Sequence, residues 1–319
     1  MAATRQLKTK IRAVKNIGQI TRAMQMVAAT KMRKSQEVAL NARPYAKKSF
    51  ALLLHLLKQA GKEETESIFW PAKGGTVPPL EKVALVVITS DKGLAGSFNS
   101  SVLRAAYKFV QDETVRSTAS NMEIVAVGKK GRDFFKARGA VIAAEFLQFS
   151  DIVTYDNVRP LADWIVQAYE TQQYSKIVVC SNQFVSALVQ KVEIRQILPL
   201  EIEALQQTIE GIVPKTGRYS ELAAGEKETE KELSSVLEPS REEIIKNLVR
   251  NLIQVQIAYF VFESNASEHS ARMVAMKNAT ENAKRLQEEL TLEWNKARQA
   301  AITQELTEIS TAKEALTAE

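Results

Sequence analysis

Residues 248–276 read LVRNLIQVQIAYFVFESNASEHSARMVAM, and apolar or small residues recur in this stretch at alternating steps of four and three. That spacing is typical of one face of a helix that packs along another helix. The surrounding residues 240–319 contain no Gly and no Pro. At about 1.5 Å per residue, such a helix would run on the order of 110 Å, far longer than a compact domain needs. We therefore predict a long C-terminal helix over residues 240–319 that forms one half of a coiled coil.

The first 60 residues supply a partner for this helix. Between Leu7 and Val27, apolar residues repeat every three or four positions, as in an amphipathic helix. Gly18 and Pro44 interrupt the pattern. Glycine costs about 1 kcal/mol in a helix interior, and proline removes a backbone donor and bends the helix. We predict a kinked helix over residues 1–60 that pairs with residues 240–319 as an antiparallel coiled coil.

The middle of the chain has a different pattern. Short apolar runs rich in β-branched residues alternate with helix-like segments, which is typical of a parallel sheet covered on both faces. A final run at 192–198 alternates with charged residues and indicates a half-exposed edge strand. The sequence therefore predicts an α/β fold, with a central Rossmann-like domain and a mostly parallel sheet over residues 81–200. The buried runs are 83–89, 124–128, 141–144 and 177–181.

Two segments flank this domain. Residues 61–80 are rich in Gly and Pro, which predicts a linker. Residues 201–239 are rich in Glu and broken by Gly and Pro, which predicts a partly disordered acidic connector.

Charge and composition narrow the functional classes. Residues 1–48 hold 12 Lys and Arg against the single acid Glu37, a net charge of +11 in a chain whose total is +6. This basic helix favours an acidic partner. No apolar stretch approaches the roughly 18 residues of a membrane span, and the N-terminus lacks the apolar core of a secretory signal. Because Cys180 is the only cysteine, no disulfide can form within the chain, and a reducing compartment is the natural setting.

The sequence offers few candidates for chemistry. Residues 90–99 follow the first predicted strand, where α/β sheets often bind ligands, and residues 128–132 read GKKGR. Neither GxGxxG nor GxxxxGK[ST] occurs, so we interpret both segments as strand-to-helix turns. His55 and His269 have no ligand-type neighbours that define a metal site. We therefore predict no catalytic residue, cofactor or metal, and a chain that is not an enzyme by itself.

Four stretches spread along the chain carry a further signal. Residues 20–29 read ITRAMQMVAA, 90–94 read SDKGL, 271–277 read ARMVAMK, and 295–300 read NKARQA. In these stretches the sequence resembles the gamma subunit of F-type, proton-translocating ATP synthases of the bacterial type. The resemblance covers essentially the whole chain.

The resemblance implies a function. The chain would be the central rotor shaft, which couples proton flow through the membrane sector to ATP synthesis or hydrolysis in a ring of alpha and beta subunits. Its implied partners are the alpha and beta subunits, the epsilon subunit and the ring of c subunits. It would sit at the cytoplasmic face of the bacterial inner membrane as a peripheral protein, without a membrane span or bound nucleic acid.

The resemblance also implies contact residues. Met24, Arg272, Gln299 and Thr303 would face a carboxylate-rich loop of a beta subunit. The basic pair Arg33 and Lys34 completes the candidate partner-binding set. For Met24 and Arg272, the alternative is a purely structural position in or beside the coiled-coil seam. The acidic connector has no cysteine pair, so the thiol switch of chloroplast relatives cannot operate.

Two other functional classes remain as alternatives. A coiled-coil nucleic-acid-binding protein would use the basic helix to contact phosphates, but the helix lacks an interleaved aromatic or base-reading pattern. An α/β nucleotide enzyme with helical arms would need one of the missing phosphate motifs. Titrating nucleotide and DNA against the isolated chain would separate these alternatives from the shaft.

Overall fold

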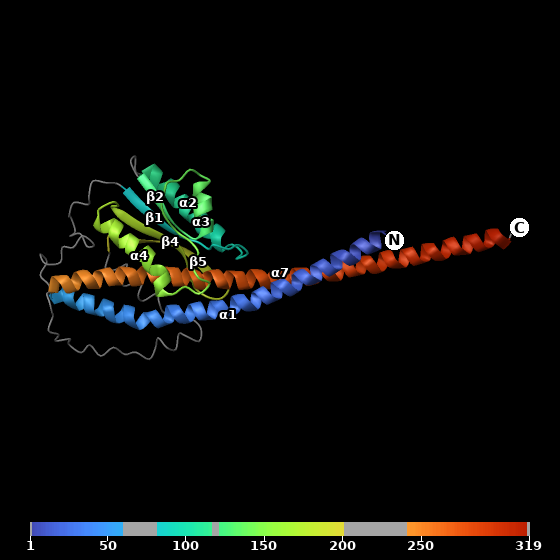
Figure 1. The fold of residues 1–319 in the computed structure, drawn as a ribbon, viewed down its shortest axis with the longest axis horizontal. Coiled ribbons are helices and arrows are strands. Elements are labelled where there is room, and N and C mark those ends of the chain that lie inside the picture. Colours follow the sequence, from blue (N-terminus) through green and yellow to red (C-terminus); the bar gives the residue numbers. More distant parts are fainter. Residues whose placement is uncertain (1, 60–81, 117–120, 201–240, 318–319) are drawn as a thin grey trace. The chain divides into compact units, whose positions relative to one another are not determined.

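The computed structural model describes residues 2–59, 82–116, 121–200 and 241–317 (Figure 1). The chain begins with helix α1 (Ala2–Gln59) and ends with helix α7 (Arg241–Thr317). These confirm the two long helices predicted from the periodicity. The predicted linker and acidic connector lie outside the described residues. The chain divides into two compact units, residues 1–28 with 272–319, and residues 29–271.

In the first unit, the start of α1 packs antiparallel against the second half of α7. The hydroxyls of Thr21 and Thr280 lie 2.8 Å apart, and a Cβ added to Gly18 would lie 3.5 Å from the Cβ of Ala283. In both pairs the residue numbers add to 301. In the second unit, Ser35 Oγ donates a 2.6 Å hydrogen bond to Asn265 Oδ1, a pair that adds to 300. The predicted antiparallel coiled coil is thus confirmed.

Gly18 offers a stabilising substitution. A Cβ at this position would make only an ordinary van der Waals contact with Ala283, so the helix pair leaves room for a methyl group. Alanine removes the helix penalty of glycine, and we expect Gly18→Ala to raise the free energy of unfolding by about 1 kcal/mol. Urea unfolding of the isolated chain, followed by circular dichroism, measures this change. A destabilised variant would show that the two helices need closer approach at this point.

The second unit is built on a five-stranded sheet. Strands β1, β2, β3 and β4 run parallel, and β5 pairs antiparallel with β4 at one edge, which gives the order β3-β2-β1-β4-β5. This confirms the predicted parallel sheet and edge strand. In chain order, the elements are β1 (Lys82–Ile88), α2 (Phe98–Arg116), β2 (Asn121–Val127), α3 (Lys129–Lys136), β3 (Ile142–Phe146), α4 (Tyr155–Glu170), β4 (Lys176–Phe184) and β5 (Gln190–Leu198).

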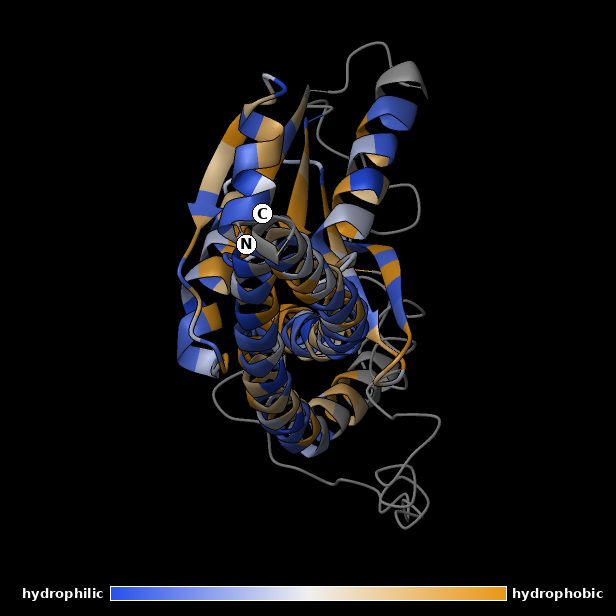
Figure 2. Ribbon diagram, turned by 90° about the vertical axis from the view of Figure 1, so that its right-hand side faces the viewer, coloured by the Kyte–Doolittle hydropathy of each residue, from blue (hydrophilic) through white to orange (hydrophobic). Residues whose placement is uncertain are grey.

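Helices cover both faces of this sheet because its strands carry apolar residues on both. On one face, side chains such as Leu85 and Ile124 pack against α2 and α3. On the other face, Val86 and Val125 join a larger core with α4, the first half of α7 and the end of α1. The central strands are mainly orange in the hydropathy view of Figure 2, whereas the helices mix orange and blue.

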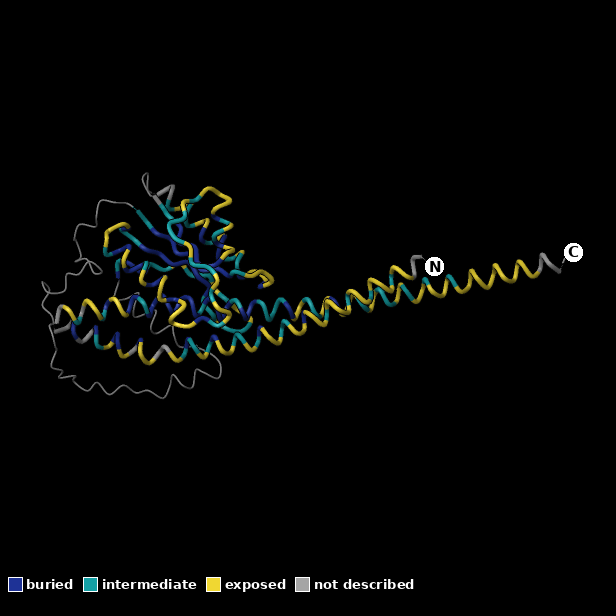
Figure 3. The backbone as a smooth tube through the Cα atoms, in the orientation of Figure 1, coloured by how far each residue is buried: buried dark blue, intermediate teal, exposed yellow. Residues whose placement is uncertain are grey.

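The first half of α7 is buried on nearly every side. Residues 252–262 are all buried or half-buried. They include Ile253, Ile257 and Val261, which lie off the predicted stripe of Leu252, Val255, Tyr259 and Phe262. A helix that is apolar all round belongs in a core, and Figure 3 shows this part of α7 in dark blue and teal beside the sheet. The larger core of the sheet domain therefore extends beyond the predicted range 81–200 and includes residues of both long helices.

None of the helices, over the residues described, has a stretch long and apolar enough to cross a membrane.

Candidate functional site

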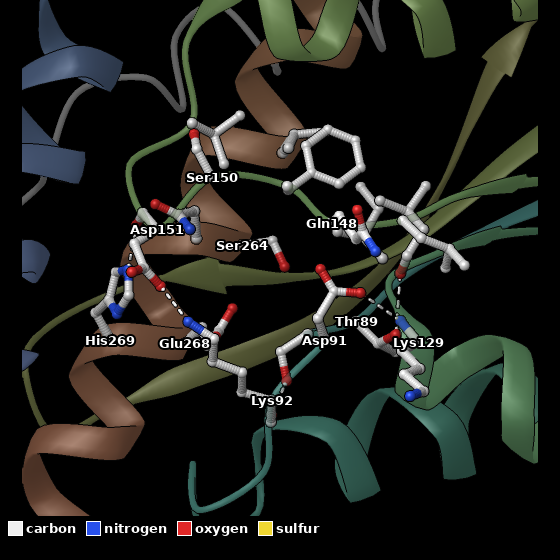
Figure 4. Close-up of a pocket in the computed structure, with 18 of the residues that line it drawn as sticks. Thr89, Asp91, Lys92, Lys129, Gln148, Ser150, Asp151, Ser264, Glu268 and His269 are labelled. Carbon is white, nitrogen blue, oxygen red and sulfur yellow. Dashed lines mark hydrogen bonds and ion pairs between the residues drawn. The ribbon is translucent and has the colours of Figure 1, made fainter.

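Hydrogen bonds join the two glycine-containing turns that follow β1 and β2 at the carboxyl ends of these strands (Figure 4). Three backbone N–H groups at the start of α3 donate to the β1 turn: Lys129 to Asp91 Oδ1 at 2.9 Å, Lys130 to Ser90 O at 3.1 Å, and Gly131 to Thr89 Oγ1 at 2.8 Å. The Asp91 carboxylate therefore takes the place that a phosphate would occupy at a helix N-terminus. The interpretation of both segments as structural turns agrees with this geometry.

Asp151, in the segment between β3 and α4, joins several elements. Its carboxylate lies 2.7 Å from Lys31 Nζ on α1 and 3.0 Å from Lys92 Nζ after β1. The backbone oxygen of Asp151 lies 2.6 Å from Nε2 of His269 on α7. Hydrogen bonds from Lys31 and then Lys92 lower the pKa of Asp151 to about 2, although burial opposes them. Asp151 therefore stays ionised near neutral pH, and His269 has a structural partner.

Glu263 places a carboxyl group inside the second unit, where α7 meets the end of β4. The residue keeps some accessible surface, but its carboxyl group is enclosed, and its Oε2 accepts a 2.8 Å hydrogen bond from the Phe184 N–H. Burial raises the pKa of Glu263 to about 7, while hydrogen bonds from Phe184 and Tyr259 partly oppose the shift. Sequence reasoning missed this residue because a single Glu beside an apolar stripe carries no signal of its own.

Cys180 is buried in the sheet. Burial raises the pKa of its thiol to about 12, so the thiolate needed for nucleophilic chemistry does not form near neutral pH. Among the described residues, no group of three His, Cys, Asp or Glu side chains could hold a metal ion.

The six candidate contact residues fall into three groups. Met24 and Arg272 are half-buried in the first unit, and the register places Met24 opposite residue 277, close to Arg272 along the pair. Gln299 and Thr303 are exposed on α7, about 40 Å further along the helix by its rise per residue. Arg33 and Lys34 are exposed on α1 in the second unit. Gln299 and Thr303 are neighbours on α7, where the Thr303 hydroxyl donates to the Gln299 backbone oxygen, whereas Met24 and Arg272 share only the same part of the helix pair.

The first unit also exposes large apolar side chains. On α7, Ile302, Leu306 and Ile309 are 43%, 62% and 66% exposed, and their spacing places them on one helix face. The register pairs residue 299 with the start of α1, so these residues extend beyond its first residue. These three side chains form an exposed apolar strip that is available for contact with another molecule. Further large apolar residues exposed in this unit are Ile17, Ile20, Met26, Val27, Leu286 and Leu292.

The chain was compared with known proteins. A family model described as ATP synthase matches residues 3–316. The chain is 38% identical to the ATP synthase gamma chain of Roseiflexus castenholzii, over 99% of both chains. It is 36% identical to the ATP synthase gamma chain of Chloroflexus aurantiacus, over 99% of this chain and all of that one.

Solved structures share the fold. One chain of the Euglena gracilis mitochondrial ATP synthase, in a structure of OSCP, F1 and the c-ring, matches with a TM-score of 0.62 at 21% identity, over 99% of this chain and 95% of that chain. A chain from the central stalk and c-ring of the Tetrahymena thermophila mitochondrial ATP synthase matches with a TM-score of 0.53 at 24% identity, over 82% of this chain and 99% of that chain.

Proposed function

Because the chain belongs to the family of ATP synthase gamma chains, we propose that it works as the central rotor shaft that couples proton flow to ATP synthesis or hydrolysis. The observation that carries this proposal is the first unit, a helix pair that leaves large apolar side chains exposed. A rod that packs only against itself would bury them. A rod that turns inside a ring of other subunits would use them as its bearing surface.

A shaft of this kind needs no active site. It couples two processes by favouring one conformation of whichever catalytic subunit it faces, so it acts through differences in contact energy. In our proposal, ATP chemistry belongs to beta subunits, and the chain is a non-catalytic subunit of the complex. Its partners are the alpha and beta subunits, the epsilon subunit and the c-ring. It is peripheral, at the cytoplasmic face of the bacterial inner membrane.

Reconstitution tests this function. Mixed with alpha and beta subunits of the same organism, the chain should copurify as one complex with ATPase activity, and alone it should neither bind DNA nor hydrolyse ATP. Strong, salt-dependent DNA binding without assembly would support the nucleic-acid alternative. That alternative has no support in the comparisons, because the curated relatives described above are gamma chains.

Charge reversal at Arg33 and Lys34 tests the basic helix as a partner surface. Both side chains are exposed, so we expect Arg33→Glu with Lys34→Glu to change the free energy of unfolding by less than about 1 kcal/mol. Assembly should weaken, because the charges orient an acidic partner. Gel filtration of the reconstituted complex at low and high salt measures the loss. Arg33→Lys with Lys34→Arg is the matched control. A destabilised chain that assembles normally would contradict this role.

Met24 and Arg272 are the proposed coupling contacts with beta subunits. Met24→Lys would add an attraction to facing carboxylates that depends on the rotor angle. At an effective dielectric constant of 20, an ammonium and a carboxylate about 4 Å apart attract one another by about 4 kcal/mol, before the costs of desolvation and salt screening are subtracted. We expect ATP hydrolysis to remain measurable while protons pumped per ATP fall severalfold, as measured in inverted vesicles. Arg272→Ala should reduce the same ratio by removing a contact.

Two conservative variants serve as controls for the coupling experiment. Met24→Leu keeps the apolar volume, and Arg272→Lys keeps the charge, so both should retain more of the pumping ratio than Met24→Lys and Arg272→Ala. If Met24→Lys and Arg272→Ala assemble and pump as the parent complex does, both residues are ordinary positions of the helix pair. The assignment of the coupling contact is then wrong, while the shaft function stands on assembly.

A further inference from the structure

A cavity of about 360 Å³ lies in the second unit, at the carboxyl ends of β1 and β2 (Figure 4). Residues 147–151, after β3, form a second side, and residues of α7 between Val261 and His269 form a third. Open α/β sheets bind their ligands outside the carboxyl ends of the strands. Small-molecule sites commonly measure 300 to 1,000 Å³. The cavity thus has the position and the size of a ligand site.

Ser264 marks this cavity as more than a gap in the packing. The residue is 2% exposed and lines the cavity, and its hydroxyl has no hydrogen-bond partner among the described residues. A serine within a helix can donate to the carbonyl four residues earlier, but Ser264 does not. In Figure 4 its oxygen points into the space between Asp91 and Lys92. Buried polar groups in proteins are nearly always paired, so this hydroxyl points to a missing partner.

The charges of the lining exclude a strongly anionic ligand. Three cationic side chains, Lys92, Lys129 and Arg132, are balanced by three carboxylates, Asp91, Asp151 and Glu268. Lys92 and Arg132 already form ion pairs within the chain. The backbone N–H groups at the start of α3, which could hold a phosphate, donate to Asp91, Ser90 and Thr89. The site therefore fits an uncharged molecule better than a phosphate.

The apolar part of the lining defines the other half of the ligand. A group of aliphatic and aromatic side chains borders the cavity beside the polar groups: Ile88, Val127, Leu147, Phe149, Val153 and Val261. An apolar wall beside groups that form hydrogen bonds suits a flat ring with a polar edge. We propose that the cavity binds a small, uncharged, nucleoside-like heterocycle, with its ring against the apolar wall and its polar edge bonded to Ser264 and Asp91.

Methyl NMR of the full chain tests this proposal with adenosine as the probe. Ile88, Val153 and Val261 provide methyl groups in the wall, and their resonances should shift saturably with adenosine. AMP and inorganic phosphate should bind at least tenfold more weakly, because each brings charge to a lining whose cations are balanced. Failure of adenosine to move these resonances, or equal binding of AMP or phosphate at the site, would overturn the proposal.

Two serine variants separate the cavity from the fold. Ser267, three residues further along α7, is fully buried with an equally unpaired hydroxyl, but it does not line the cavity. Each of Ser264→Ala and Ser267→Ala removes an unpaired hydroxyl, so neither should unfold the chain. Ser264→Ala should weaken adenosine binding three- to tenfold, as expected for one lost hydrogen bond, and Ser267→Ala should leave it unchanged. Equal affinities for the two variants would contradict the role of Ser264.

Discussion

Replacing Gly128 with alanine is expected to lower the free energy of unfolding by about 4 kcal/mol or more. A loss of this size is a large part of the total stability of a typical protein. Gly128 has φ 89° and ψ 147°, a backbone region that side chains avoid at a cost of about 1 to 3 kcal/mol. An added Cβ would also lie 2.2 Å from the Thr89 carbonyl oxygen. Because that oxygen belongs to the backbone at the end of β1, no side-chain rotation relieves the clash.

Gly93→Ala is the matched control for this change. Gly93 lies in the turn after β1, and a Cβ there would meet nothing within 4 Å. We expect its free energy of unfolding to stay within about 0.5 kcal/mol of the parent chain. Urea unfolding followed by tryptophan fluorescence measures both variants. If the free energy of unfolding of Gly128→Ala lies within about 1 kcal/mol of the parent value, β1 and α3 can separate at little cost in free energy, and the expectation is wrong.

Glu263→Gln is expected to stabilise the chain above neutral pH. The pKa of Glu263 rises from an ordinary 4.5 to about 7 on folding. Between these values the unfolded chain releases the proton and the folded chain keeps it, so the free energy of unfolding falls as pH rises and levels off above pH 7. The shift corresponds to roughly 3 kcal/mol. Glutamine does not titrate, so the variant avoids this loss. At pH 8 its free energy of unfolding should exceed that of the parent chain by a similar amount.

The difference in free energy of unfolding between Glu263→Gln and the parent chain isolates the effect of Glu263. Denaturant unfolding at several pH values should give equal stabilities near pH 4.5 and a gap that opens up to pH 7. The control Glu289→Gln, at an exposed position on α7, should follow the parent chain throughout. A constant gap at all pH values would show that the glutamine acts through packing and that Glu263 is charged in the folded chain.

Sequence periodicity predicted most of the fold. Both long helices, their antiparallel pairing and all five strands follow from local spacing, because side-chain burial repeats every 3.6 residues in helices and every two in strands. Periodicity did not predict that the first half of α7 lies inside the core of the sheet. The stripe through Leu252 and Val255 was read as one seam, whereas Ile253 and Ile257 fill the opposite side. Which surfaces cover a helix depends on residues far away in the sequence.

The candidate site could be predicted only in part. The missing phosphate motifs indicated that neither turn holds a phosphate, and the N–H groups at the start of α3 donate to Asp91, Ser90 and Thr89 instead. The contacts around Asp151 escaped notice, since Lys31 and Asp151 are 120 positions apart and each is an unremarkable charge. Nothing in the local sequence distinguishes Glu263 and Ser264 from exposed Glu and Ser residues, because only the folded chain encloses them. The partner contacts of Met24, Arg33, Lys34, Arg272, Gln299 and Thr303 stay predictions, because they depend on other subunits.

The register of the helix pair in the first unit restricts how the gene can change in length. Thr21 faces Thr280, and Gly18 lies opposite Ala283 with the same sum of residue numbers. One inserted codon between them would turn every residue on one side by about 100° relative to its partner. Insertions and deletions that survive in a lineage should therefore avoid the paired ranges or occur together in both helices. A fluorescent or affinity tag spliced into the chain should obey the same rule.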